Sequence, residues 1–226
     1  MASEPPHDEP ERAPLRRLAR RASLAQEAHD SIRRDLLSGA WLRGEVLLEQ
    51  GLAERLRMSR TPVREALHRL ALAGMIEPAP GGGYVRRGST PRDIREHCEL
   101  RLLLEPQAAA LAAGSGGAGL ATALERELAA EPGPEPVRNM RLHTGIADAS
   151  GNDVLAGLIR MINERVAVHH LHAGRDAAYD AGHRAILAAL RHGDPEAAAA
   201  AMREHLESVE RALLEQVRRD RRPIDA

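Results

Sequence analysis

The sequence has almost no aromatic residues. Trp41, Tyr84 and Tyr179 are the only three in 226 residues, and phenylalanine is absent. Leucine, alanine, valine and isoleucine must therefore fill the core of a chain that is 43% hydrophobic. Because alanine and leucine favour helix over strand, the composition predicts a mainly α fold.

Cysteine is nearly absent as well. Cys98 stands alone, which excludes a disulfide framework within the chain and fits a reducing compartment. No apolar run reaches the roughly 18 residues of a membrane-spanning helix, and the N-terminal segment has no apolar stretch typical of a signal peptide. We therefore expect a cytoplasmic protein with no membrane contact.

Lysine is missing too, so arginine supplies all 32 basic residues. The net charge of -1 conceals an uneven distribution along the chain. Residues 12–90 contain 15 arginines and 8 acids, whereas residues 91–226 contain 17 arginines and 21 acids. A basic first part beside an acidic second part indicates a polyanionic partner for the first part.

The N-terminal residues 1–22 are rich in proline, glutamate and arginine and have little apolar periodicity, which is typical of a flexible arm. Ser23 is expected to cap a helix that begins at Leu24, because apolar residues then recur at every fourth position.

The pattern over residues 23–88 predicts a winged helix-turn-helix domain. Two further helices are expected at 49–56 and 61–72, joined by a tight turn. A strand, a glycine-rich turn and a second strand follow within 75–86 and form a small β-wing.

Residues 89–226 are expected to form an all-α effector domain, a six-helix bundle without β structure. Glycine and proline clusters separate six segments with helical periodicity. Their approximate spans are 91–113, 119–131, 137–150, 152–172, 175–191 and 194–218.

The first domain carries residues suited to reading DNA. In a helix-turn-helix, the second helix enters the major groove with its N-terminal end against the bases. Arg60 and Arg64 lie one turn apart at that end, where guanidinium groups can reach guanine O6 and N7. The candidate contacts at the helix start and in the wing turn are Ser59, Arg60, Thr61, Arg64, Gly82 and Gly83.

The residues of this domain closely resemble the signature of the GntR family of bacterial regulators. Residues 52–67 read LAERLRMSRTPVREAL, and the later GMI at 74–76 and GYV at 83–85 match the helix end and the wing. The resemblance implies that Arg60, Thr61 and Arg64 recognise an operator. It also brings Gln50 into the interface, at a position where many family members have a basic residue.

The second domain carries histidines that can converge on one point. Asn139 and His143 are four residues apart and share one helix face, while His183 and His205 lie on two further helices. Three imidazoles and an amide oxygen suit zinc, nickel or iron. The alternative is a set of hydrogen-bonded core histidines without a metal.

Several short runs resemble the FCD effector domain of the FadR subfamily of GntR regulators. They are RLLLE at 101–105, NMRLH at 139–143, SGN at 150–152, HRAIL at 183–187, GD at 193–194 and MREHL at 202–206. Six helices resemble its VanR-like branch. Many such domains hold a metal with one aspartate and three histidines, so the resemblance implies a site of His143, His183 and His205 with Asn139 in the aspartate's place.

Arg101 resembles the arginine of the effector cavity in this family. Its guanidinium can hold a carboxylate with two hydrogen bonds, and a metal beside it would suit a small organic acid. The alternative is a salt bridge with Glu105, one helical turn further on.

These features predict a non-enzymatic, ligand-responsive regulator, most consistent with a repressor. As a homodimer it would read a pseudo-palindrome with two recognition helices about 34 Å apart. Two alternatives stay open: a metal-dependent hydrolase with an accessory DNA-binding head, and a DNA-binding protein without an effector.

Overall fold

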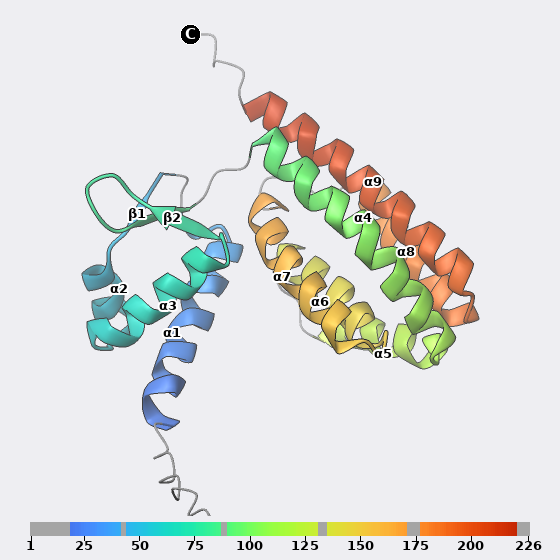
Figure 1. The fold of residues 1–226 in the computed structure, drawn as a ribbon, viewed down its shortest axis with the longest axis horizontal. Helices are drawn as coiled ribbons and strands as arrows, with labels where there is room; N and C mark the ends of the chain where they lie inside the picture. The colour runs from blue at the N-terminus through green and yellow to red at the C-terminus, as the bar shows by residue number, and fades with distance from the viewer. Residues whose placement is uncertain (1–18, 42–43, 87–89, 131–134, 171–176, 221–226) are drawn as a thin grey trace, which may run out of the picture.

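The computed structural model describes residues 19–41, 44–86, 90–130, 135–170 and 177–220. Within these residues there are nine helices and three short strands. They form an N-terminal part with the sheet and a C-terminal bundle, which lie beside each other (Figure 1). The expected mainly α fold is confirmed.

The N-terminal part contains α1 (Ala19–Leu37), α2 (Glu49–Leu56) and α3 (Arg60–Leu72). The apolar faces of the three helices meet in one buried cluster. Helix α1 begins at Ala19, about a turn before the expected start. Ser23 therefore lies inside the helix and is not its N-cap, and the predicted arm over 1–22 is wrong for residues 19–22. Residues 1–18 lie outside the described part.

A three-stranded antiparallel sheet completes this part. It has the order β1-β3-β2, with β1 (Val46–Leu47), β2 (Ile76–Pro78) and β3 (Tyr84–Arg86). The β2–β3 hairpin is the expected wing, whereas β1 was not expected. Gly83 has φ +79°, and a Cβ at this position would lie 2.8 Å from the carbonyl oxygen of Leu47. Glycine is therefore required here for β1 to approach β3.

The C-terminal bundle contains six helices, each ending within two residues of the predicted limits. They are α4 (Pro91–Gly114), α5 (Gly117–Ala130), α6 (Glu135–Asp148), α7 (Asp153–His170), α8 (Ala177–His192) and α9 (Pro195–Asp220). Thr90 and Asp93 form a capping box at the start of α4, and Asp194 accepts a hydrogen bond from the backbone N–H of Ala197 at the start of α9.

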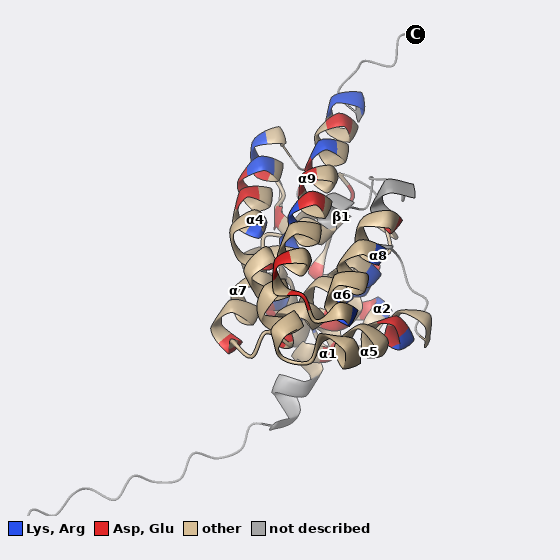
Figure 2. Cartoon of the chain, turned by 90° about the vertical axis from the view of Figure 1, so that its right-hand side faces the viewer, with Lys and Arg blue, Asp and Glu red and all other residues tan. Residues whose placement is uncertain are grey.

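The two longest helices, α4 and α9, lie along each other through most of their length (Figure 1). Both helices carry acidic and basic residues (Figure 2). Cys98 of α4 is buried between them, against Ile94, Val209 and Leu213. In the described residues, no helix combines the length and the apolar character needed to cross a bilayer.

The two parts share a packed contact. Met140 of α6 and Ala167 of α7 belong to the same buried cluster as the core of the N-terminal part. Arg33 of α1 donates a hydrogen bond to Sδ of Met140 at 3.0 Å and lies 3.5 Å from Glu164. The bundle helices that face the N-terminal part are therefore α6 and α7.

Candidate functional site

The start of α3 presents the residues predicted to read DNA. Ser59, Arg60, Thr61 and Arg64 are all exposed, as a groove-reading surface requires. Pro62 is buried in the first turn, where its missing N–H costs no hydrogen bond. Ser59 is the N-cap by position, but its side chain makes no capping hydrogen bond. The first N–H groups of α3 thus keep the character of an anion site.

A residue that the sequence analysis did not single out joins these arginines. Glu49, the first residue of α2, accepts hydrogen bonds from Nε of Arg64 at 3.0 and 3.1 Å and from Nη2 of Arg64 at 3.0 Å. Nη2 of Arg60 donates to Glu49 Oε2 at 3.3 Å. The hydrogen bonds from Arg64 hold the pKa of Glu49 below its usual range, so this carboxylate stays charged.

The remaining predicted DNA contacts differ in their surroundings. Gln50 is exposed on α2, where its Nε2 donates to Oε1 of Glu54 at 3.2 Å. Gly82 has φ +103° and open space around it, as a wing tip near DNA would need. Gly83 is instead explained by the close contact with β1 described above.

In the bundle, three histidines from three helices come together. The candidate ligand atoms of His143, His183 and His205 all lie within 4.8 Å of one another. Gly182 makes room for this cluster, because a Cβ at that position would lie 2.5 Å from Nδ1 of His205. Asn139 also reaches the cluster, with its Oδ1 3.2 Å from Nε2 of His183. The predicted set of four residues is therefore brought together.

The surroundings of His143 keep its imidazole neutral and fix its tautomer. Burial lowers the pKa of His143, and the carboxylate of Glu105 opposes that shift only in part. Nδ1 of His143 lies 2.5 Å from Oε2 of Glu105, so Nδ1 carries the hydrogen and donates it. Nε2 then has a lone pair, and it is buried with no hydrogen-bond partner in the described structure.

His205 is 2% exposed, and burial together with His143 and His183 lowers its pKa. Neutral imidazoles are the form that binds a metal, and a carboxylate behind a ligating histidine is a common orienting partner. The buried lone pair of His143 and the donor set of three imidazoles and one amide therefore fit a divalent transition metal.

Arg101 lies next to this cluster and is 1% exposed. Its Nε donates to Oε1 of Glu105 at 2.6 Å, and its Nη2 lies 3.3 Å from Nδ1 of His143. The salt bridge with Glu105 that the spacing allowed is thus formed. Burial alone would raise the pKa of Glu105, but Arg101 and His143 hold it well below its usual range.

Asn163 of α7 is a second residue that the sequence did not point to. Its Nδ2 donates to Oε1 of Glu105 at 3.2 Å, while its Oδ1 is buried without a hydrogen-bond partner in the described structure. Only the packing of α7 against α4 reveals this position, because nothing in the local sequence marks the residue.

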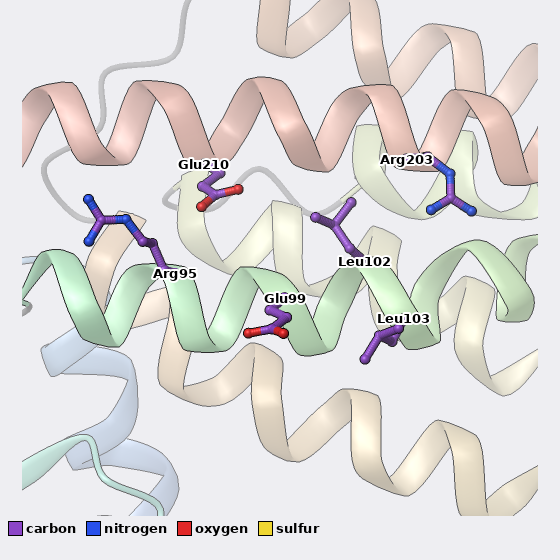
Figure 3. A pocket seen from close by; sticks show the side chains of 6 residues that line it. All are labelled: Arg95, Glu99, Leu102, Leu103, Arg203 and Glu210. Carbon is purple, nitrogen blue, oxygen red and sulfur yellow. The ribbon is translucent and has the colours of Figure 1, made fainter.

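A surface groove between α4 and α9 offers a different environment (Figure 3). It has a volume of about 310 Å³, and Leu102 points toward α9 while Leu103 points away from it. Two arginines and two glutamates complete its lining: Arg95, Glu99, Arg203 and Glu210. Balanced exposed charges give no preference for an anion, unlike the buried surroundings of Arg101.

Comparison with known proteins finds a family model that matches each of the two parts. Residues 24–85 match the model of the bacterial regulatory proteins of the gntR family, and residues 96–208 match the FCD domain model. The chain is 34% identical over 223 residues to the Uxu operon transcriptional regulator of Escherichia coli, covering 84% of this chain and 86% of that protein.

Two further relatives agree. The probable D-xylose utilization operon transcriptional repressor of Paenarthrobacter nicotinovorans is 29% identical over 198 residues, covering 82% of this chain and 87% of that protein. The solved structure of McbR/YncC of E. coli has a TM-score of 0.70 and 25% identity, covering 86% of this chain and 98% of that one.

An exposed recognition helix with a wing, followed by a helical sensor-like bundle, defines a transcriptional regulator. This chain belongs to the GntR family and carries an FCD domain. It is a regulator and not an enzyme, so the alternative of a metal-dependent hydrolase falls away.

Proposed function

We propose that this protein is a ligand-responsive repressor of the FadR subfamily, VanR-like branch. It acts in the cytoplasm, binds a pseudo-palindromic operator as a homodimer, and changes its affinity for DNA when a small carboxylate effector binds beside a metal ion. The observation that carries the DNA-binding part is the pair of exposed guanidinium groups, of Arg60 and Arg64, at the N-terminal end of α3.

The proposed interface consists of the start of α3, the start of α2 beside it and the tip of the wing. Arg60 and Arg64 contact bases, Ser59 and Thr61 contact phosphates or base edges, and Gln50, Gly82 and Gly83 lie at the edges of the contact. Guanidinium groups of this kind favour guanine, for which a good bidentate contact contributes about 1–3 kcal/mol of discrimination.

A selected operator tests this interface. The full-length protein would first select its preferred duplex from a randomised pool. Arg64→Ala should then weaken binding to that duplex by about 1–3 kcal/mol and leave binding to unrelated duplex much less affected. Arg69→Ala is the matched control, because Arg69 lies on the same helix but near its C-terminal end, away from the proposed base contacts. Equal losses on both duplexes would reduce Arg64 to a phosphate contact.

A homodimer is supported by exposed apolar residues on two helices of the bundle. Helices α4 and α7 pack together through Ala108, Leu155 and Ile159. On their outer sides they expose large apolar side chains at helical spacing: Leu100, Leu103, Leu111, Val154, Leu158 and Met161. Such a concentration on a soluble protein indicates an interaction surface, and a twofold axis would pair it with its own copy.

The metal site is proposed at Asn139, His143, His183 and His205, with zinc the first choice and nickel or iron the others. The bound ion would supply open coordination positions for an oxygen of the effector. Metal analysis of the purified protein tests this site. His183→Ala should lose the metal, whereas His192→Ala, on the same helix but exposed, should keep it. Equal metal content in both variants would contradict the site.

Arg101 is proposed to bind the carboxylate of the effector. A buried cation beside the histidine cluster favours an anion, and the effector would share or replace Glu105 as its partner. A thermal-shift screen of hydroxy acids, sugar acids and dicarboxylates tests this role. Stabilisation seen with the native protein should disappear in Arg101→Met. A DNA-binding protein without an effector would show no stabilisation by any of these acids.

A further inference from the structure

We infer that Glu49 is a specificity-determining positioning residue, which holds Arg64 and Arg60 in the orientation that reads the operator while opposing their binding to unrelated DNA. This inference rests on the proposed DNA interface and adds to it a residue that does not itself contact a base.

The geometry shows which edge of Arg64 the carboxylate occupies. Glu49 accepts from Nε and Nη2, which form the side-on edge of the guanidinium, at 3.0–3.1 Å. Because the guanidinium is planar, this leaves its end-on edge, Nη1 with the second hydrogen of Nη2, directed away from the carboxylate. The end-on edge has the geometry for guanine O6 and N7. Glu49 therefore fixes the plane of the group without blocking its base-reading side.

The position of Glu49 explains how one side chain can orient two arginines. It is the first residue of α2, and its carboxylate is 21% exposed, whereas the side chains of Arg60 and Arg64 are 61% and 60% exposed. The less exposed partner thus lies on the helix that packs against α3. Arg60 and Arg64 share Oε2 of this carboxylate, so the two groups are held together as one unit.

The charge of Glu49 has the opposite effect on binding without sequence preference. Such binding comes almost entirely from attraction between basic groups and phosphates. The carboxylate of Glu49 lies beside the start of the recognition helix α3. It repels phosphates and neutralises part of the attraction that the two arginines exert on them. It is therefore expected to lower affinity for any duplex that does not repay this repulsion with base contacts. Loss of the charge of Glu49 should therefore lower affinity for the operator and raise affinity for unrelated DNA.

The test compares Glu49→Gln with the native full-length protein on the selected operator and on an unrelated duplex of equal length. Glutamine keeps the shape but loses the charge. We expect operator affinity to fall by about tenfold and nonspecific affinity to rise about two- to fivefold, so discrimination should fall about 20- to 50-fold. Glu65→Gln is the matched control, with the same charge change on α3 at a carboxylate that pairs with Arg69, outside the proposed contacts. It should leave discrimination unchanged.

Two further measurements separate positioning from a merely structural role. In the Arg64→Ala background, Glu49→Gln should cost less operator affinity than in the native background, since its main partner is gone and only the hydrogen bond from Arg60 remains. Glu49→Asp, which keeps the charge on a shorter side chain, should retain low nonspecific affinity but lose part of the operator affinity. Thermal melting of each variant shows whether the fold is intact.

Failure of the Glu49 inference can be told apart from failure of the proposed DNA interface. If Arg64→Ala leaves operator affinity unchanged, the interface itself is misassigned. A different result overturns the inference alone. If Arg64→Ala weakens operator binding, but Glu49→Gln lowers affinity for the operator and for unrelated duplex equally or changes neither, then Glu49 merely joins α2 to α3.

Discussion

Arg165 of α7 donates a hydrogen bond from Nε to the carbonyl oxygen of Ala73 at 3.1 Å, immediately after the end of α3. A guanidinium at this position complements the negative end of the helix dipole and satisfies a terminal carbonyl. Arg165 is also two residues from Asn163, which contacts Glu105 beside the histidine cluster. One helix thus reaches both the proposed sensor site and the recognition helix.

This contact predicts that Arg165→Ala reduces communication between the two parts. Metal content should stay at the native level, because the histidine cluster is untouched. The change in operator affinity on adding or removing the metal should shrink at least threefold, given typical couplings of about 1–3 kcal/mol. Binding titrations with metal-loaded and metal-stripped protein measure the effect.

The control for this prediction lies on the same helix. Arg160 pairs with Asp148 on the surface of the bundle, so Arg160→Ala removes a guanidinium without touching the recognition helix. Both variants behaving alike would mean that Arg165 has no special part in coupling.

The exposed apolar side chains of α4 predict the effect of a charge on self-association. Leu103 is 68% exposed, so Leu103→Glu should not disturb the fold of one chain. If the face pairs with its own copy, two glutamates would be desolvated near the twofold axis, and dimer affinity should fall at least tenfold. Light scattering over a concentration series measures this. Leu72→Glu, with the same 68% exposure on α3, should leave the dimer intact.

The chemistry of Asn139, the proposed fourth ligand, predicts the effect of a conservative change. Asn139 offers a neutral amide oxygen, whereas a carboxylate binds divalent ions more strongly. Asn139→Asp should therefore raise metal affinity by about tenfold, provided that the amide stands at the metal. Competition with a chelator measures the affinity of native and variant protein. Unchanged affinity would place Asn139 outside the coordination sphere, as a hydrogen-bond partner of His183 alone.

The order of the helices and most of their limits could be predicted because the helices carry an apolar period and glycine or proline follows many of them. Helix α2 is an exception, since Arg57 takes the left-handed position at its end. Strand β1 was missed because two residues have no period, and only the approach of Gly83 to Leu47 creates it. The convergence of the histidines was foreseen from spacing and family resemblance.

The partners of the site residues were harder to predict. Glu49 looked like an ordinary acid at a helix start, and its role depends on how α2 packs against α3. Glu105 was foreseen only as a neighbour of Arg101 by i,i+4 spacing, while its contacts with His143 and Asn163 join residues 38 and 58 positions apart. Local sequence carries no signal for such distances.

The buried carboxylate of Glu105 predicts how stability depends on pH. Its pKa is lowered in the folded protein, chiefly because Arg101 and His143 outweigh the effect of burial. The stability that it contributes is therefore present above its ordinary pKa of about 4.3 and is lost as pH falls through the lowered pKa. Glu105→Gln would leave Arg101 buried without its counter-charge and should cost about 3–5 kcal/mol near pH 7.

Urea unfolding of metal-free protein at several pH values tests this prediction. The difference between native and Glu105→Gln protein should narrow as pH falls below about 4.3. Glu125→Gln is the control, because its ion pair with Arg191 is exposed and should contribute little. A constant difference down to the lowest pH would show that the charge of Glu105 is not what stabilises the fold.

The turn between α2 and α3 contains the one non-glycine residue with positive φ in the described chain, Arg57, at φ 52° and ψ 43°. A side chain costs about 1–2 kcal/mol in this conformation, while glycine loses about 0.5–1 kcal/mol more backbone entropy on folding. Arg57→Gly should therefore raise the free energy of unfolding by about 0.5–1 kcal/mol. Glu54→Gly, inside α2, should instead lower it by about 1 kcal/mol, since glycine weakens a helix interior. Opposite signs from the same substitution at positions three residues apart would locate the strain in the turn. A loss of stability in both variants would contradict it.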